Sequence, residues 1–227
     1  MITRPAQIVF PEFSRSKHCI PWIYEPGTPY SIGIDPGYSH PGVVFIAHVQ
    51  GDGSPDRDIV FAEFVEDDVP EEKLLGIMDK MIRDLGERPQ LISSDRALPQ
   101  FNQRMMRKWT DVRIKTRQSK SDQDVWGGIE VVRSLLDPTE GPPRLYFSDR
   151  LLKTLKRGVI SCFEQARRKT KDSEVLDALY KDNRTDHQID SVSYWATAHY
   201  GKRGWQAQEK TVQSDQYSRR MNALHRR

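Results

Sequence analysis

The sequence is poor in cysteine, with only Cys19 and Cys162 in 227 residues. The two show neither a CxxC spacing nor a disulfide framework, so we expect a reducing compartment. The first residues lack the continuous apolar core of a signal peptide. No apolar run approaches the roughly 18 residues that can span a bilayer. We therefore expect an intracellular chain that does not associate with a membrane.

A large charge imbalance is also absent, because the formal net charge is only +3. The cations are nevertheless clustered, and clustered cations suit a polyanion whose counterions they displace. Solvated helix faces are the alternative interpretation of each cluster. A further basic group of residues follows Tyr200. From the internal clusters we select as DNA-binding candidates Arg113, Lys115, Arg117, Lys120, Arg167, Arg168 and Lys169.

The chain is long enough for one well-buried domain with peripheral segments. Residues 1–29 contain prolines at positions 5, 11, 21, 26 and 29 and no sustained period, which predicts an extended lead-in. We expect a single domain over residues 30–200. Residues 201–227 are polar and basic, which predicts a tail that is flexible or folds on a partner.

Alternation and turn signals predict the secondary structure of this domain. Helices are expected at about 70–85, 99–109, 122–136, 149–168 and 186–200, with a polar loop before the last. Strands are expected at 30–35, 43–49, 59–65, 91–95, 112–114 and 145–147. Three meandering strands followed by alternating helices and strands predict an α/β fold, in which a mixed sheet carries helices on both faces.

The chemistry is predicted from acids at the ends of these elements. Asp35 and Asp95 each end a strand, where open α/β sheets bind ligands. Asp186 and Asp190 are four residues apart at a helix start and therefore share one face, together with His187. Such acids repel one another unless cations neutralise them, and hard divalent ions prefer oxygen ligands.

We therefore predict a site for two Mg²⁺ or Mn²⁺ ions that hydrolyses a phosphodiester. Asp35 is expected to bridge both ions, while Asp95 and Asp190 each hold one side. Asp186 as a further ligand and His187 as a catalytic contributor rank second.

Each of these residues also has a purely structural interpretation. Asp35 precedes Pro36 and Gly37, an ordinary turn sequence. Asp95 is placed to cap the next helix. Asp186 suits the N-terminal end of a helix, and His187 a capping or scaffold role. The combination of all four acids favours the catalytic interpretation.

Five segments together resemble the C-terminal nuclease domain of the large terminase subunit of tailed bacteriophages, an RNase H-like fold. Three contain the acids and two are apolar. The segments are residues 9–13 (VFPEF), 30–37 (YSIGIDPG), 92–95 (ISSD), 128–133 (GIEVVR) and 186–194 (DHQIDSVSY).

The resemblance implies an endonuclease that cuts concatemeric viral DNA during packaging, in the cytoplasm of an infected bacterium. Its implied partners are double-stranded DNA, an ATPase domain, the small terminase and the portal protein. Two features depart from the family. The chain has no GxxxxGK[ST] phosphate loop for an ATPase motor, and Ser191 stands where alanine is more common.

Three alternatives remain open on the sequence. A Holliday-junction resolvase has the same fold and similar motifs, although no dimer seam is evident. Actin-like and sugar-kinase ATPases share a first motif like that around Asp35, but need glycine-rich phosphate loops that are missing downstream. A non-catalytic module that docks on DNA or a portal protein is the third, and Trp205 and Tyr217 in the basic tail suit stacking.

Overall fold

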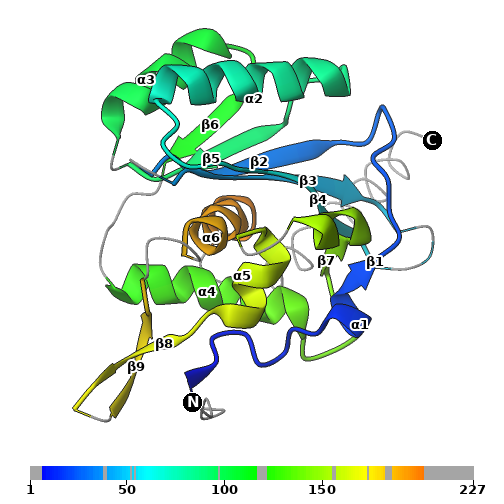
Figure 1. The fold of residues 1–227 in the computed structure, drawn as a ribbon. Helices are drawn as coiled ribbons and strands as arrows, with labels where there is room; N and C mark the ends of the chain where they lie inside the picture. The colour runs from blue at the N-terminus through cyan, green and yellow to red at the C-terminus, as the bar shows by residue number, and fades with distance from the viewer. Residues whose placement is uncertain are drawn as a thin grey trace, which may run out of the picture.

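A seven-stranded mixed sheet forms the centre of the protein, as the computed structural model shows (Figure 1). The structure describes residues 7–37, 40–51, 53, 55–96, 98–116, 122–154, 157–172, 174–181 and 186–201. The strand order is β1-β7-β4-β3-β2-β5-β6. The strands are β1 (Cys19–Ile20), β2 (Tyr30–Asp35), β3 (Gly42–Val49), β4 (Arg57–Val65), β5 (Leu91–Ser94), β6 (Arg113–Thr116) and β7 (Leu145–Ser148).

The middle of this sheet is the antiparallel meander β2-β3-β4. On one side β5 and β6 continue parallel to β2, and on the other side β7 and β1 continue parallel to β4. Parallel neighbours require crossover connections, which the intervening helices supply. The carboxyl ends of β2, β5 and β6 consequently lie at one edge of the sheet, where the site is found.

Helices cover both faces of the sheet (Figure 1). The upper face carries α2 (Glu71–Leu85) and α3 (Pro99–Lys108), and the lower face carries α4 (Asp122–Leu136), α5 (Val159–Gln165) and α6 (Asp186–Tyr200). A short helix, α1 (Arg15–His18), and a 3₁₀ turn, η2 (Asp149–Lys153), complete these layers. The predicted α/β architecture with helices on both faces is confirmed. None of the helices in the described ranges is long and apolar enough to cross a membrane.

Helix α2 illustrates how local sequence sets these elements. Two acids occupy its first turn and favour the positive end of the helix dipole. Leu74, Met78 and Ile82 follow at helical spacing and are buried against the sheet. Gly86 ends the helix in the left-handed region with φ of 80°, which glycine adopts without strain.

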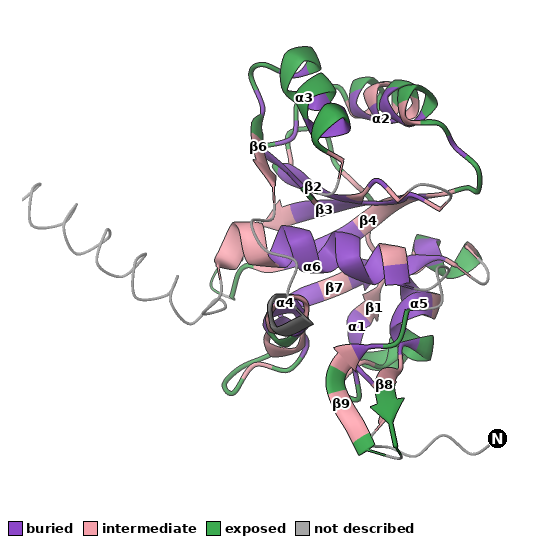
Figure 2. Cartoon of the chain, turned by 90° about the vertical axis from the view of Figure 1, so that its left-hand side faces the viewer, coloured by how far each residue is buried: buried purple, intermediate pink, exposed green. Residues whose placement is uncertain are grey.

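Helix α6 is buried between the sheet and the helices α4 and α5, as Figure 2 shows by its largely purple surface. It lies very close to the strands beneath it. A Cβ atom added to Gly33 of β2 would lie 2.1 Å from the Ser191 carbonyl oxygen, and one added to Gly42 of β3 would lie 2.6 Å from that of His187. The two glycines therefore allow the backbone of α6 to rest directly on the sheet.

The helix predicted over residues 149–168 is wrong. The chain forms η2, then begins α5 at Val159, whose N–H donates to the Glu63 carboxylate at 2.6 Å. After α5 the backbone pairs with the N-terminal segment, because Val9 N–H donates to the Ala166 carbonyl. These long-range contacts interrupt a helix that local periodicity favoured.

The polar loop predicted before the last helix is also wrong over most of its length. Residues there form a two-stranded antiparallel hairpin, β8 (Arg168–Lys171) and β9 (Glu174–Leu179). Asp172 at its turn has a positive φ of 48°, a conformation that aspartate tolerates better than most residues. The hairpin projects from the lower layer of the molecule beside α4 (Figure 1).

The N-terminal segment contributes to the folded core. Val9 and Phe10 are buried, and the Phe10 ring stacks on Phe163 of α5 at 4.4 Å. Strand β1, which also lies within residues 1–29, pairs with β7 and forms one edge of the sheet. Part of the segment predicted as an extended lead-in is therefore integral to the sheet.

Candidate active site

Asp35 and Asp95 come from adjacent strands. Strands β2 and β5 are parallel, and their register pairs Ile34 with Ser94. The next residue on each strand is the aspartate, so the two backbones are neighbours at a strand spacing of about 4.8 Å. The Asp95 carboxylate does not cap α3, because the N-cap of that helix is Leu98 and it receives no side-chain hydrogen bond.

Helix α6 brings the other predicted residues to the same edge. His187 Nδ1 lies 2.8 Å from Asp35 Oδ2. Asp186 and Asp190 are almost completely buried, with 2% and 1% of their surface exposed. The turn contact expected of Asp35 is also present, since Gly37 N–H approaches Asp35 Oδ1 at 3.4 Å.

Ser191 fastens the helix to the strand that carries Asp35. Its hydroxyl accepts a hydrogen bond from Asp35 N–H at 2.9 Å and lies 2.8 Å from the carbonyl oxygens of Gly42 and His187. This residue departs from the common alanine of the resembling family. In this chain it links β2, β3 and α6 at the point where the acids meet.

Lys181 is a further charged residue of the site, and the sequence did not single it out. It follows β9, and its ammonium group donates to Asp190 Oδ2 at 2.7 Å. About half of the Lys181 side chain is exposed, whereas Asp190 is enclosed. The turn residues around Asp172 were the available signal for this hairpin, but no local pattern indicated where its second strand would lead.

The electrostatics confirm that the charged groups share one environment. Burial raises the pKa of Asp190 to about 6; the Lys181 ammonium opposes this rise, and the charges of Asp35 and Asp186 add to it. Burial lowers the pKa of His187, but the hydrogen bond and charge of Asp35 outweigh it, so the net shift is upward. The acids therefore form a concentrated negative site.

The donor set fits divalent metal ions. Three buried carboxylate oxygens at this edge, Asp95 Oδ1, Asp186 Oδ1 and Asp190 Oδ1, have no hydrogen-bond partner within the described ranges. Leaving such oxygens unpaired is costly unless a ligand satisfies them. A hard cation with oxygen ligands would do so.

The predicted DNA-binding residues divide into several groups. Lys115 donates to the Ala198 carbonyl at 2.6 Å, and its pKa is lowered by burial and by neighbouring Arg113, which is exposed on β6. Arg168 bonds Asp177 and lies over the Trp126 ring at 4.7 Å. Internal contacts therefore occupy Lys115 and Arg168.

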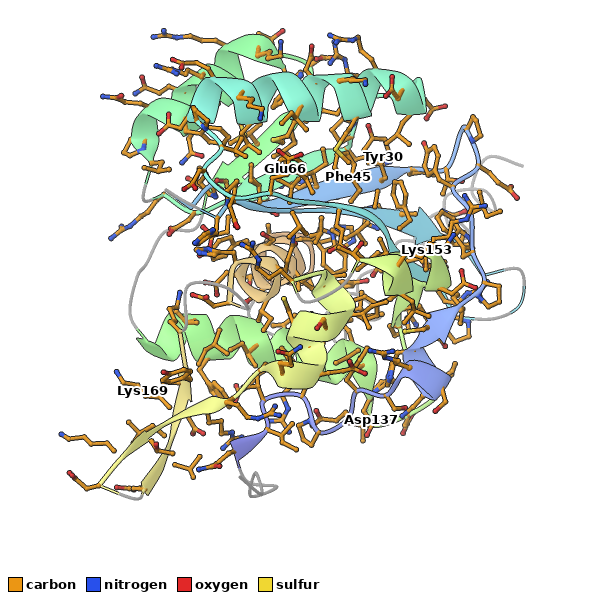
Figure 3. All side chains as sticks on the ribbon, in the orientation of Figure 1. Tyr30, Phe45, Glu66, Asp137, Lys153 and Lys169 are labelled. Carbon is orange, nitrogen blue, oxygen red and sulfur yellow. The ribbon has the colours of Figure 1, made fainter. Side chains whose placement is uncertain are left out.

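The remaining candidates lie on or near the hairpin, or outside the described ranges. Arg167 donates to the carbonyl oxygens of Glu164 and Ala166. Lys169 is exposed on the hairpin, and Figure 3 shows it beside α4 on the lower layer of the molecule. Lys169 and Lys181 both line a cavity of about 380 Å³ that runs along the hairpin toward the acids. Arg117 and Lys120 are outside the residues that the structure describes.

The mixed sheet and its two helical layers define an RNase H-like fold, as found in the nuclease domains of large terminases. No protein-family model matches the chain, and no curated protein sequence matches it. The similarity is one of structure.

Three solved structures show this similarity. The nuclease domain of the bacteriophage SPP1 large terminase, with bound Mn, superimposes with a TM-score of 0.51, 16% identity and coverage of 73% of this chain and 84% of that one. The nuclease of the thermophilic phage G20c large terminase, with bound magnesium, gives 0.57, 12%, 83% and 95%. The large terminase of another thermophilic bacteriophage gives 0.63, 15%, 85% and 45%. This chain therefore spans less than half of that last protein.

Proposed function

We propose that the protein is a divalent-metal-dependent endodeoxyribonuclease that cuts concatemeric viral DNA during genome packaging. The observation that carries this proposal is the convergence of buried carboxylate oxygens without hydrogen-bond partners, within the described ranges, beside Asp35. The fold supports it, because structures with this fold include terminase nucleases that hold Mn, magnesium or cobalt.

The residues of the site have complementary roles in this proposal. Asp35, Asp95 and Asp190 would hold two Mg²⁺ or Mn²⁺ ions, with Asp186 as a further ligand. Such ions activate the attacking water and stabilise the leaving oxygen of a phosphodiester. His187 hydrogen-bonds Asp35 and holds its carboxylate in one orientation.

Lys181 and the hairpin belong to the substrate side. The Lys181 ammonium offsets part of the negative charge around Asp190, which would otherwise repel a phosphate. Lys169 continues the positive charge along the cavity from this point. Double-stranded DNA would approach along the hairpin, and Arg113, Arg117, Lys120, Arg167 and Arg168 extend the proposed contact surface.

The proposed setting is a packaging motor in the cytoplasm of an infected bacterium. A large terminase from a thermophilic bacteriophage has been solved with ADP, and this chain matches less than half of that protein. An ATPase domain, the small terminase and the portal protein are the partners that this setting supplies.

A plasmid-nicking assay with Mg²⁺, Mn²⁺ or EDTA tests the proposal. We expect metal-dependent loss of supercoiled plasmid by the parent and by Asp84→Asn, an exposed control on α2. Asp35→Asn should reduce the rate to background, because it weakens a metal ligand and leaves the packing unchanged. Cutting by Asp35→Asn at the parental rate would contradict the two-metal assignment.

A synthetic four-way junction serves as a competing substrate in the same assay. Selective, symmetrical cutting of the junction would identify a resolvase instead. If neither substrate is cut, titration with Mn²⁺ distinguishes two explanations. Binding that Asp35→Asn loses indicates a nuclease that needs its motor, whereas no binding indicates a docking module.

A further inference from the structure

A second cluster of metal-ligand side chains lies at the other end of the same strands. His48 is near the end of β3, Asp58 is near the start of β4, and His199 is near the end of α6. One ligand atom from each of the three lies within 4.8 Å of the others. His48 is six residues along β3 from Gly42, which pairs with Asp35, so the two sites are about 20 Å apart.

We propose that His48, Asp58 and His199 form a binding site for a transition-metal ion, with Zn²⁺ the best match. Two imidazoles and one carboxylate suit Zn²⁺, whereas Mg²⁺ prefers oxygen ligands alone. Three protein ligands leave one tetrahedral position for water. This inference is independent of the nuclease proposal, because none of its residues belongs to the acid cluster.

The surrounding groups already orient two of the ligands. His48 Nδ1 lies 2.6 Å from Asp58 Oδ1, and the other ring nitrogen, Nε2, lies 2.7 Å from Ser31 Oγ. Tyr200 donates its hydroxyl hydrogen to Asp58 Oδ2. A metal-bound histidine characteristically uses its second nitrogen in such a bond, and a bound carboxylate is itself hydrogen-bonded. Nδ1 of His48 and Oδ1 of Asp58 thus face the same point.

His199 is held beside this pair. Its ring stacks on the ring of His48, with centroids 4.6 Å apart and planes inclined by 15°, and Trp195 packs against both. His199 makes no hydrogen bond with the described part of the chain. An imidazole that is positioned by packing and keeps its nitrogens available suits a metal ligand.

The distances are compatible with binding after a small movement. A tetrahedral ion with bonds of about 2.0–2.1 Å separates its ligand atoms by about 3.3 Å. The three atoms lie within 4.8 Å of one another, so a shift on the order of 1 Å would bring them into range. Rotation of the His199 side chain at the end of α6 can supply that shift.

A hydrolytic role for the same residues is excluded by burial. Ser31, His48 and Asp58 form a serine–histidine–aspartate chain of hydrogen bonds, the connectivity of a nucleophilic triad. Ser31, however, is fully buried in β2, between β3 and β5. No substrate can reach its hydroxyl, whereas its position as support for His48 needs no access.

The proposed ion would join the end of α6 to the hairpin of β3 and β4. An ion that binds only the folded protein stabilises it increasingly as its concentration exceeds Kd. The same helix carries Asp186 and Asp190 at its other end, so the ion would hold it at the end remote from the acid cluster.

Zn²⁺ binding to the full chain, measured by equilibrium dialysis in excess Mg²⁺, tests the proposal. We expect one Zn²⁺ per chain in the parent and in two controls near the acid cluster, Asp35→Asn and His40→Gln. His199→Gln should weaken binding at least about 10-fold, and Ser31→Ala by roughly 10- to 100-fold, as removal of supporting bonds does.

A second readout separates binding from folding. The melting temperature of the parent should rise with Zn²⁺ and that of His199→Gln should not, although the two proteins melt alike in EDTA. Unchanged Zn²⁺ affinity in both His199→Gln and Ser31→Ala would overturn the proposal. Loss of the ion in Asp35→Asn would also overturn it, because the ion would then belong to the acid cluster.

Discussion

Gly33 lies directly beneath α6, and Gly33→Ala tests whether that contact sets the spacing of the acids. The new methyl carbon would lie 2.1 Å from the Ser191 carbonyl oxygen, 2.9 Å from its carbonyl carbon and 3.2 Å from Trp195 Cβ. Cβ contacts below 3.0 Å are essentially never found, so helix and strand must separate by about 1 Å. Backbone atoms of a buried helix cannot rotate away as a flexible side chain can.

The expected cost is at the upper end of the range for overpacking a core, about 3 kcal/mol of unfolding free energy. For a domain of this size that cost lowers the melting temperature by about 6–12 °C. The shift also moves Asp190 relative to Asp35. A misplacement of about 1 Å can reduce a reaction rate about 100-fold, so nicking should fall more than stability alone explains.

Urea denaturation of Gly33→Ala beside Gly76→Ala provides the measurement. Gly76 is exposed on α2, and an added Cβ there meets nothing within 4 Å. Alanine is the better helix former, so Gly76→Ala should stabilise the protein by roughly 0.5–1 kcal/mol. If Gly33→Ala were as stable as the parent, the close seating of α6 on β2 would be refuted.

Three further predictions follow from neighbouring contacts. Ser191→Ala removes the hydroxyl that accepts from Asp35 N–H, so unfolding free energy should fall by about 1–3 kcal/mol in urea; an unchanged midpoint would count against the link. Burial raises the pKa of Glu63 to about 7, so the folded protein holds this proton more tightly than the unfolded chain does. Stability should fall as pH rises from about 4.5 to 7. Glu63→Gln should flatten this fall and add on the order of 3 kcal/mol above pH 7, with no gain below pH 4.5, and parallel curves for parent and variant would contradict it. Lys169→Ala should weaken DNA binding and reduce the salt dependence by about one unit of slope, measured by fluorescence anisotropy; an unaltered slope would remove Lys169 from the DNA surface.

Local sequence was sufficient to predict most of the elements. Helix α2 has its acids, apolar stripe and terminal glycine in consecutive turns, so its bounds depend on few distant residues. Apolar strands that end on Asp35 and Asp95 indicated where the site would be, because a charged residue after a buried strand needs a ligand or solvent. The placement of Asp186 and Asp190 on one helix face followed from helical geometry alone.

The sequence failed where distant segments compete with local periodicity. A helix was favoured over residues 149–168, but Glu63 starts α5 at Val159 and the N-terminal segment pairs beyond it. These partners are about 95 to 160 positions away in the chain, and no window of neighbouring residues contains them.

Sequence by itself determined the strands, the acids and the class of chemistry they suit, because strand alternation, helix periodicity and residue type are local properties. Only the tertiary structure decided that Lys181 meets Asp190 and that Ser191 holds Asp35. It alone brought His48, Asp58 and His199 together. Their meeting depends on strand register and on how closely α6 approaches the sheet, which packing of the whole chain sets.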